Sequence, residues 1–473
     1  MPDGALIALE QLLQWLLVAE HELLLFAAFW FVVSAVDEAA VDISWAWLRL
    51  GGRASATRLP PGLRDSPLLG RAAILVPAWH EDTVIGHMIA HMLGSWRQRD
   101  FIVYVGCYRN DPATLAAAAA GAGGDARVRL VVNQVDGPTT KADCLNRLYA
   151  ALRADEARSG VQFRNVVMHD AEDMVHPAAL AVIDRALAEV EFVQLPVRPE
   201  PQPSSIWIAG HYSDEFTEAH AKTLVVRDAL GAAIPAAGVG CGFSREAIAS
   251  LARLRMAAGE PGPFAAECLT EDYELGLLIA RDGGRSRFLR MRDEDGHLVA
   301  TRSYFPATLE TSVRQKARWI HGIALQGWER LGWSSRPVEI WMALRDRRGP
   351  LTAVVLAAAY VLLVIEGVLG AARLAGWIDW LEPSPPLRFL IAASLASFVW
   401  RCAMRFAFTT REYGLFEGLV AIPRIFVANV IAIMAGRRAL SAYIRSLGGA
   451  EVSWDKTKHG VHPAAGPPEA AAA

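Results

Sequence analysis

The sequence predicts an α/β domain with a parallel sheet, inserted between membrane helices near the two ends of the chain. Two observations support this fold class. Of the 473 residues, 53% are hydrophobic, and the long apolar runs gather near the ends. In the middle, short apolar runs alternate with segments of helical spacing, as in parallel sheets that are covered by helices on both faces. The net charge is only −3 and no basic cluster is interleaved with aromatic residues, which speaks against a nucleic-acid partner.

The first membrane helix is expected within residues 1–50. Its apolar run, Leu23–Val36, has about 14 residues and is shorter than the ~20 that cross a bilayer, but it can be extended at either end. A cleaved signal peptide is the alternative, although no basic segment precedes the run. Arginines follow the helix and acidic residues precede it, so the N-terminus is expected outside and the middle of the chain in the cytoplasm.

The second group of membrane helices is expected in residues 346–446. Pro350–Leu374 leads outward from the basic stretch RDRRG, and Leu387–Phe408 returns after a loop rich in Trp and Pro. Leu415–Leu440 has basic residues on both sides and contains Pro423. Two half-helices in the inner interface explain that stretch better than a full crossing, and a further crossing is the alternative.

These boundaries leave a cytoplasmic domain in residues 65–345 and a flexible tail in residues 447–473 that ends in Pro, Gly and Ala. The five cysteines are scattered without a C-x-x-C pair, which speaks against a zinc site and against a disulfide framework. We therefore expect reduced thiols in a cytosolic compartment.

The domain opens with four expected strands, Ala72–Val76, Phe101–Tyr108, 126–132 and 165–173, which are separated by helices. Ligands of parallel sheets bind beyond the carboxyl ends of the strands. Acidic residues fall at such ends, namely Glu81, Asp111 and the cluster after Met168. No G-x-G-x-x-G follows the first strand and no P-loop sequence occurs, which speaks against a dinucleotide dehydrogenase and against a P-loop enzyme.

The stretch VVMHDAEDMVHP sets Asp170, Glu172 and Asp173 directly after an apolar run. A solvated acidic turn is the simpler explanation when the stretch is taken alone. Carboxylates at the end of a buried strand also suit a divalent cation. The position of the stretch at the carboxyl end of a parallel strand favours this second interpretation.

Two further stretches allow a structural and a functional interpretation. In KADCLN, Lys141 could meet a phosphate and Asp143 a base or ribose, or the segment could simply cap a helix. In GVGCGFSR, Gly240 and Gly242 flank Cys241. These glycines either serve a loop that needs positive φ or give a backbone surface that a sugar can approach closely.

Two more stretches lie nearer the C-terminal membrane helices. In LTEDYELG, Thr270 stands where an N-cap would be and Asp272 in the first turn, so the stretch is either a capping arrangement or the source of a general base. In RQKARWIHG, Gln315, Arg318 and Trp319 share one helix face. That face suits an Arg against a diphosphate with an indole beside a sugar, and juxtamembrane anchoring is the alternative.

Five motifs follow one another in the order VPxxxE, KAD, DAED, TED and QxxRW, with membrane helices on both sides. This order resembles the membrane-embedded family-2 glycosyltransferases, the group that includes the cellulose and hyaluronan synthases. The stretches MHDAEDMVHP, EFTEAHAKTLVVR with GVGCGFSR, and IPRIFVANVIAIMAGRRAL resemble in particular the bacteriophage adsorption protein B type. The resemblance covers roughly Val32 to Ser446.

The resemblance implies a GT-A fold and roles for the motif residues. Asp272 would be the catalytic base, with Glu271 and Thr270 beside it. Asp170 and Glu172 would hold Mg²⁺ or Mn²⁺ with Asp173 close by, and which of the latter two touches the metal stays open, because the family usually has Asp at the position of Glu172. The nucleotide sugar would be bound by Pro77, Glu81, Asp111, Lys141, Asp143, Asp170, Gln315, Arg318 and Trp319. The acceptor would be bound by Gly240, Cys241, Gly242 and Trp319.

The implied function is that of a metal-dependent, inverting glycosyltransferase of a bacterial inner membrane. It would transfer a sugar, of N-acetylhexosamine type on this resemblance, from a UDP-sugar to a polysaccharide that is extended and exported. Membrane lipids and an outer-membrane export partner would accompany it. Transfer of one sugar to a lipid carrier is a second enzymatic interpretation, and an inactive membrane receptor or scaffold, such as a phage-adsorption component, is the non-enzymatic one. Intact Asp170, Asp272 and Arg318 favour an enzyme.

Overall fold

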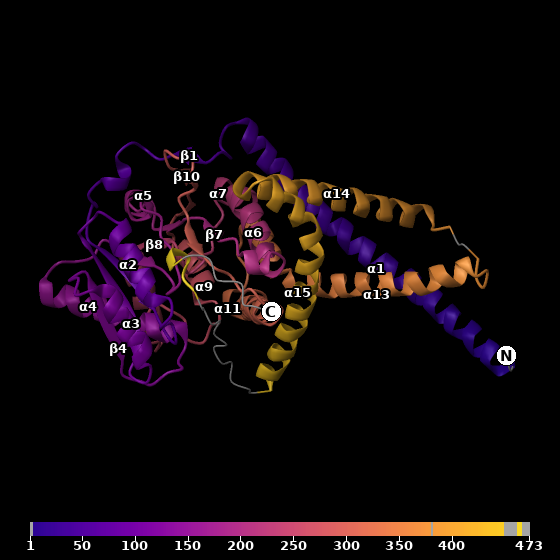
Figure 1. Ribbon diagram of the computed structural model, residues 1–473, viewed down its shortest axis with the longest axis horizontal. Helices are drawn as coiled ribbons and strands as arrows, with labels where there is room; N and C mark the ends of the chain where they lie inside the picture. Colours follow the sequence, from indigo (N-terminus) through magenta and orange to yellow (C-terminus); the bar gives the residue numbers. More distant parts are fainter. Residues whose placement is uncertain (1–2, 380–381, 449–460, 466–473) are drawn as a thin grey trace.

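The computed structural model describes residues 3–379, 382–448 and 461–465 of the chain. Figure 1 shows an α/β domain at one end of an elongated molecule and long helices that extend from it towards the other end. The N-terminus of α1 (Asp3–Leu50) lies at the far tip of these helices. The α/β class that the middle of the sequence predicts is confirmed.

The domain is built on a seven-stranded sheet with the order β4-β3-β2-β5-β8-β6-β9. Strands β2 to β5 are parallel neighbours, whereas β8 runs antiparallel to both β5 and β6. In sheet order the strands span Val128–Asn133, Phe101–Tyr108, Ala72–Pro77, Asn165–Met168, Cys241–Ser244, Phe192–Gln194 and Ser286–Phe288. The four predicted strands are therefore present, and the second half of GVGCGFSR forms the antiparallel strand β8.

Helices cover both faces of the sheet, because successive side chains of a strand point to opposite faces. Ile74 of β2 packs in a core cluster with residues of α2 and α5, and Leu75 packs on the other face with residues of α4 and α8. All residues of β2 are buried, as expected for a strand that is covered on both faces. The helices of the domain span Ile85–Ser95 (α2), Pro112–Ala122 (α3), Lys141–Ser159 (α4), Ala179–Ala186 (α5), Arg245–Ala257 (α8) and Glu271–Arg281 (α9).

Shorter helices lie between the sheet and the long helices (Figure 1). Two of them continue through π-helical turns, which often mark functional sites. The first runs from α6 (Ile208–Glu218) through Ala219–Thr223 into α7 (Leu224–Ala229), and the second from α10 (Leu309–Trp319) through Ile320–Gln326 into α11 (Gly327–Leu331). The remaining elements are α12 (Pro337–Arg347) and two parallel strand pairs, β1 (Thr57–Arg58) with β10 (Met291–Arg292) and β7 (Val197–Pro199) with β11 (Thr301–Ser303).

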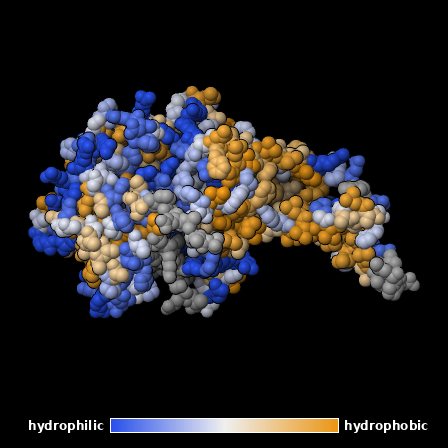
Figure 2. Space-filling model, viewed as in Figure 1, coloured by the Kyte–Doolittle hydropathy of each residue, from blue (hydrophilic) through white to orange (hydrophobic). Residues whose placement is uncertain are grey.

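Four helices of the described chain are long and apolar enough to cross a membrane, namely α1, α13 (Gly349–Leu374), α14 (Pro385–Tyr413) and α15 (Leu415–Leu447). Figure 2 shows a band of apolar residues over this part of the molecule, whereas the α/β domain is largely hydrophilic on the same face. α1 packs against α13 and α14, so helices from the two ends of the chain form one group.

The course of α15 differs from the two half-helices that the sequence predicts, because it is one helix that continues through Pro423. It runs across α13 and α14 rather than along them (Figure 1) and packs against both. Proline lacks the N–H that would bond to the preceding turn. The buried Arg424 pairs with Glu417 of the preceding turns of α15 and lies 3.4 Å from Asp214 of α6, so a pair across the proline and a contact with α6 hold the helix here.

The described part of the tail, residues 461–465, packs against the domain. His462 is fully buried, and its Nε2 donates to the backbone oxygen of Asp173 at 3.0 Å. Its ring stacks near that of His87 in α2, with the ring centroids 6.3 Å apart. The remainder of the tail that the sequence predicts to be flexible, beyond Gly448, lies outside the described residues.

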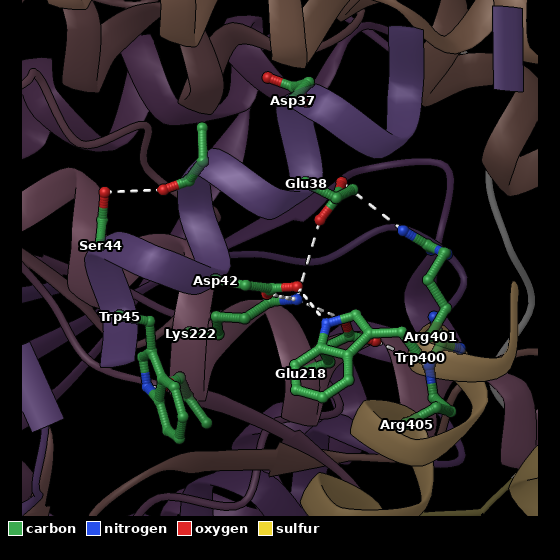
Figure 3. Close-up of polar contacts among 12 residues, drawn as sticks. Asp37, Glu38, Asp42, Ser44, Trp45, Glu218, Lys222, Trp400, Arg401 and Arg405 are labelled. Atoms are coloured by element: carbon green, nitrogen blue, oxygen red, sulfur yellow. Dashed lines mark hydrogen bonds and ion pairs between the residues drawn. The ribbon is translucent and has the colours of Figure 1, made fainter. Parts of the chain in front are cut away.

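Buried ion pairs join α1 and α14 to the π-helical turn that follows α6 (Figure 3). The ammonium of Lys222 lies 2.7 Å from Asp42 of α1 and 2.8 Å from Glu218 of α6. Glu218 also pairs with Arg405 of α14 at 2.9 Å, and the indole N–H of Trp400 donates to Asp42 at 2.8 Å. Removing one partner of a buried pair leaves an uncompensated charge, so these contacts fix the position of α6 relative to the long helices.

Candidate active site

A cavity of about 440 Å³ opens at the carboxyl ends of β2, β5 and β6. This is the edge of a parallel sheet at which ligands are expected to bind. The start of α9 and one face of α10 close the opposite side. The wall brings together the following residues that the sequence predicts: Pro77, Glu81, Lys141, Asp170, Glu172, Asp173, Thr270, Glu271, Asp272, Gln315, Arg318 and Trp319.

Lys141 lies among the carboxylates of the cavity. Its Nζ is 2.6 Å from Oδ1 of Asp170. Burial alone would lower the pKa of Lys141, but the charges of Asp170, Glu271 and Asp272 raise this pKa above its usual value. The lysine is therefore a permanent positive charge between the loop after β5 and the start of α9. It occupies the first turn of α4, which begins after Thr140.

Asp173 holds the loop after β5 in shape. Its Oδ2 accepts hydrogen bonds from the ring of His169 at 2.8 Å and from the backbone N–H of Asp170 at 3.0 Å. Burial raises the pKa of Asp173, and the hydrogen bond from His169 offsets part of that effect. Asp170 and Glu172 are only half-buried. On this wall of the cavity, the carboxylates of Asp170 and Glu172 are thus more accessible than that of Asp173.

The carboxylates of this loop suit a divalent cation that is bound together with a phosphate ligand. Within the described residues, the acidic and histidine side chains whose ligand atoms gather within 4.8 Å are Asp293, Asp295 and His297, away from the cavity. The loop after β5 therefore does not form a closed cage of three ligands. Mg²⁺ at phosphate sites commonly takes one or two carboxylates and completes its shell with phosphate oxygens and water. Asp170 and Glu172 fit this kind of site.

Thr270, Glu271 and Asp272 begin α9 at the floor of the cavity. Thr270 stands at the N-cap position, but its side chain makes no capping hydrogen bond. Oδ1 of Asp272 accepts from the backbone N–H of Tyr273 at 2.8 Å. Burial raises the pKa of Asp272, and burial together with the charge of Asp272 raises the pKa of Glu271 to about 8. Both acids therefore hold protons more tightly than in water, and Lys141 offsets part of the shift.

The loop before β8 comes very close to Asp272. Gly238 has a φ of +75°, and a Cβ atom at this position would collide with Oδ2 of Asp272. Gln194 fixes this loop, since its Oε1 accepts from the N–H of Ala237 at 2.8 Å and its Nε2 donates to the oxygen of Val239 at 2.9 Å. Only glycine meets both the positive φ and the close approach.

The residues predicted to contact the acceptor in GVGCGFSR lie outside the cavity wall. Cys241 and Gly242 belong to β8 and are buried in the sheet. A Cβ atom on Gly242 would collide with Ile183, and one on Gly240 would collide with Thr301. These glycines serve close packing within the domain, and Gly238 is the glycine of this stretch that lies beside the cavity.

Two predicted ligands of the nucleotide are also outside the wall, because their carboxylates bind the backbone. Asp111 accepts from the N–H of Thr114 at 3.3 Å, at the start of α3, and from the N–H of His80 at 2.7 Å. Asp143 forms a capping box with Thr140 at the start of α4. For Asp143 the structure therefore shows the capping interpretation that the sequence left open.

The QxxRW stretch and an aromatic cluster form the side of the cavity that faces the long apolar helices. Trp319 packs near Phe216 of α6, with ring centroids 6.2 Å apart, and Phe216 packs on Phe305 at 4.9 Å. All three rings line the cavity together with Arg318. Arg318 makes no ion pair with another described residue, so its charge is available to an anionic ligand.

Sequence reasoning missed several residues of this site. Gln194 ends the buried strand β6 as a polar residue, the same kind of signal that singled out Asp170. Gly322 lies so close to Thr270 that a Cβ atom there would collide with the threonine side chain, and it stands three residues after Trp319, the end of the QxxRW stretch. Phe216 belongs to EFTEAHAKTLVVR, which the sequence analysis used only for the family resemblance, and Phe305 comes from a segment with no distinguishing pattern; the fold brings both rings to the cavity.

Comparisons with known proteins agree with this geometry. Residues 70–322 match the profile of the family described as glycosyltransferase like family 2. The bacteriophage adsorption protein B of Escherichia coli K12 and the bacteriophage N4 adsorption protein B of Escherichia coli O157:H7 are each 32% identical over 457 residues, which cover 90% of this chain and 60% of the relative. The chain thus spans about 60% of the length of the curated relatives it matches.

The comparison of this structure with a solved structure bears on the fold alone. The mannosyltransferase from Pyrobaculum calidifontis, in complex with GDP-Man and Mn²⁺, is 17% identical to this chain with a TM-score of 0.52. The match covers 88% of this chain and 99% of the other one. It therefore includes the long apolar helices as well as the α/β domain.

Proposed function

The chain belongs to glycosyltransferase family 2 and has the GT-A fold, and we propose that it transfers a sugar from a nucleotide-sugar donor to an acceptor hydroxyl with inversion at the anomeric carbon. One observation carries this proposal. Lys141, Asp170, Asp272 and Arg318, which come from four separate parts of the chain, line a single cavity at the carboxyl edge of the sheet. A cavity that holds both cationic groups for a diphosphate and a buried carboxylate suits sugar transfer.

The donor is proposed to be a UDP-sugar, with the diphosphate near Lys141 and Arg318. Two positive side chains on opposite walls would neutralise charge as the diphosphate departs. Pro77 and Glu81, at the end of β2, line the same cavity and are the proposed contacts of the nucleoside. The structural relative from Pyrobaculum calidifontis holds GDP-Man, so a GDP-sugar is the alternative that an assay has to include.

Mg²⁺ or Mn²⁺ is proposed to bind at Asp170 and Glu172 together with the diphosphate. The ion would supply positive charge to the leaving group in the transition state. Mn²⁺ accompanies the donor in the structural relative, which supports the assignment of this cofactor class. Asp173 is proposed to act on the loop rather than on the ion, because its Oδ2 already accepts two hydrogen bonds.

Asp272 is the proposed general base. The acceptor hydroxyl attacks the anomeric carbon, its oxygen forms the new glycosidic bond, and its proton passes to the carboxylate of Asp272. The bond between the anomeric carbon and the diphosphate oxygen breaks, and the electron pair leaves with the nucleoside diphosphate. A single displacement of this kind needs one base and gives inversion. Trp319 and Phe216 offer an apolar wall for the acceptor sugar.

The reaction is proposed to take place at a bacterial inner membrane, with residues 65–345 in the cytoplasm. α1, α13 and α14 would cross the bilayer, whereas α15, which runs across them, would lie in the inner interface. The acceptor is proposed to be a growing polysaccharide, of N-acetylhexosamine type, that is exported through an outer-membrane partner. Transfer of one sugar to a lipid carrier is the second enzymatic possibility.

A non-enzymatic role has one observation in its favour, namely the names of the curated relatives as phage adsorption proteins. Such a role would need no intact base or ion site. The pKa of Asp272, which burial raises, and the ion pair of Lys141 with Asp170 support an enzyme instead.

The test is release of nucleoside diphosphate by the purified, detergent-solubilised full chain with a panel of UDP- and GDP-sugars and Mn²⁺. We expect release with one donor, loss on addition of EDTA and a loss of at least 10²-fold in Asp272→Asn. Asp282→Asn is the matched control, because Asp282 is exposed at the other end of α9. A folded protein that binds no nucleotide and releases none would support the scaffold role.

A further inference from the structure

A second groove, of about 940 Å³, lies between α10 and α15. Leu269 and Arg318 line both this groove and the catalytic cavity, so the two adjoin. The groove uses the face of α10 that carries Val313 and Ala317, next to the face that carries Trp319, and it continues to His321 in the π-helical turn after α10. A ligand in this groove therefore lies directly beside the site of transfer.

The groove is strongly positive. Its lining contains Glu310 as the acidic residue and five arginines: Arg314, Arg318, Arg437, Arg438 and Arg445. Glu310 already pairs with Arg314 at 2.6 Å. Arg318, Arg437 and Arg445 make no ion pair with another residue of the described chain. Positive charge gathered in a groove attracts anions and concentrates them there.

His321 adds a neutral polar group to the groove. It is 3% exposed, and its Nε2 has no hydrogen-bond partner among the described residues. Burial lowers the pKa of His321, so the ring is neutral at physiological pH. A buried polar atom without a partner next to a positive groove points to a ligand that completes the site.

The neighbouring charged cavity at the junction with α1 is different. Its lining includes Glu38, Glu218 and Asp346, which pair with its arginines, and Glu215, which pairs with Lys316 of α10. Charge there is balanced within the protein and holds the helices together. The groove between α10 and α15 has no such balance.

The position of α15 relates the groove to the membrane surface. Phe426, Val430, Leu440 and Ile444 are exposed along one face of α15. Figure 2 shows the apolar band giving way to hydrophilic surface at the C-terminal end of this helix. An exposed apolar stripe next to arginines is typical of a helix that lies at the bilayer surface, where the cations reach lipid phosphates.

From these observations we infer that the groove between α10 and α15 binds the phosphate headgroup of an anionic membrane lipid, beside the catalytic cavity. Arg437 and Arg445 contact the phosphate from α15, Arg314 lies opposite on α10, and the acyl chains lie along the apolar stripe of α15. The inference goes beyond the proposed function, since the binding needs neither donor nor turnover. It also brings a phosphate-bearing lipid to the wall that Arg318 shares with the site of transfer.

The experiment measures thermal unfolding of the detergent-purified full chain with added phosphatidylglycerol, phosphatidylcholine or inorganic phosphate, without donor. We expect phosphatidylglycerol alone to raise the Tm by several degrees, because a ligand that binds the folded state stabilises it. The double variant Arg437→Gln/Arg445→Gln should lose at least half of that rise. The matched control Arg53→Gln/Arg58→Gln, which removes two exposed arginines after α1, should keep it.

Three results would overturn the inference: an equal rise in the double variant, an equal loss in the control, or a rise with inorganic phosphate that equals the rise with the lipid. If the Gln variant already has a lower Tm without lipid, Arg437→Lys/Arg445→Lys serves as the second variant. It keeps both positive charges, so phosphatidylglycerol must still raise its Tm. The outcome is independent of the proposed function, because nucleoside diphosphate release is measured separately on the same variants.

Discussion

At the scale of single residues, Lys141 and Gly238 set the surroundings of Asp272. Lys141 lowers the pKa of Asp272, which burial alone would raise further. Gly238 leaves the space that the carboxylate occupies. The proposed base is thus held between a fixed positive charge and bare backbone, and it keeps one side open to the cavity. A carboxylate in such a place is buried enough to be a stronger base than one in water.

The first prediction concerns Gly238→Ala. The new Cβ would collide with Oδ2 of Asp272. The alanine would also have to adopt a φ of +75°, which costs about 1–2 kcal/mol in itself. We expect kcat/KM to fall at least tenfold while the protein still folds. Gly231→Ala is the control, since Gly231 has a φ of +64° but no atom within 4 Å of the added Cβ. It should lower the Tm slightly and leave kcat/KM unchanged.

The second prediction concerns the pH dependence of turnover. The proposed mechanism needs Asp272 ionised, and burial raises its pKa from the ordinary 3.8. The folded protein therefore holds this proton more tightly, so kcat/KM should rise with pH along an acid limb placed above pH 4. In Lys141→Met the limb should move to still higher pH, because the lysine stabilises the ionised carboxylate. A limb that stays in place in this variant would argue against Asp272 as the base.

At the scale of elements, two helices interrupted by π-helical turns connect the cavity to the long apolar helices. α6 carries Phe216 into the cavity, and the turn after it carries Lys222 into the ion pairs with α1 and α14. α10 carries Arg318 and Trp319, and it packs against α15. The proposed wall for the acceptor is thus built on the same elements that contact the long apolar helices.

The third prediction tests this junction. Lys222→Met leaves Asp42 and Glu218 buried without their shared partner, and a loss of about 3–5 kcal/mol is typical of such a change. We expect a Tm lowered by many degrees in detergent. Arg97→Met is the control, because Arg97 is 68% exposed and its pair with Asp65 at 3.1 Å should contribute little. Equal effects in the two variants would mean that the junction adds no stability.

At the scale of the whole molecule, segments far apart in the chain meet at the loop after β5. Residues 461–465 lie near the C-terminus of the chain, and His462 donates to the backbone oxygen of Asp173. His169 holds the side chain of the same aspartate. The proposed ion ligands Asp170 and Glu172 therefore sit on a loop that is fixed from both sides.

The fourth prediction concerns His462→Ala. Removing the buried ring leaves the oxygen of Asp173 without its donor and loosens the loop that carries Asp170. We expect the concentration of Mn²⁺ for half-maximal activity to rise about 10-fold, in line with the loss of a group that supports metal ligands. Ala464→Ser, an exposed position in the same segment, should leave that concentration unchanged. An unchanged Mn²⁺ dependence in both variants would contradict a role for the segment.

The local properties of the sequence were enough to predict a large part of this molecule. Buried runs of apolar residues define β2 to β5, and acids placed after such runs point to the edge of the sheet at which Asp170 and Glu172 line the cavity. The long apolar helices also follow from composition, because their length and hydropathy are properties of the segment itself. The roles of the motif residues in catalysis and metal binding stay predictions.

Other features were decided by the tertiary structure alone. The position of β8 in the sheet decides that Gly238, and not Gly240, lies beside Asp272. Asp111 and Asp143 do not line the cavity, because their carboxylates accept hydrogen bonds from backbone groups at the starts of α3 and α4. The course of α15 through Pro423 depends on Arg424 meeting α6. The groove between α10 and α15 combines arginines more than a hundred residues apart. Each of these features depends on contacts between segments that are far apart in the sequence, and local patterns do not predict such contacts. Apolar runs and their periodicity, in contrast, can be recognised within a single segment of the chain.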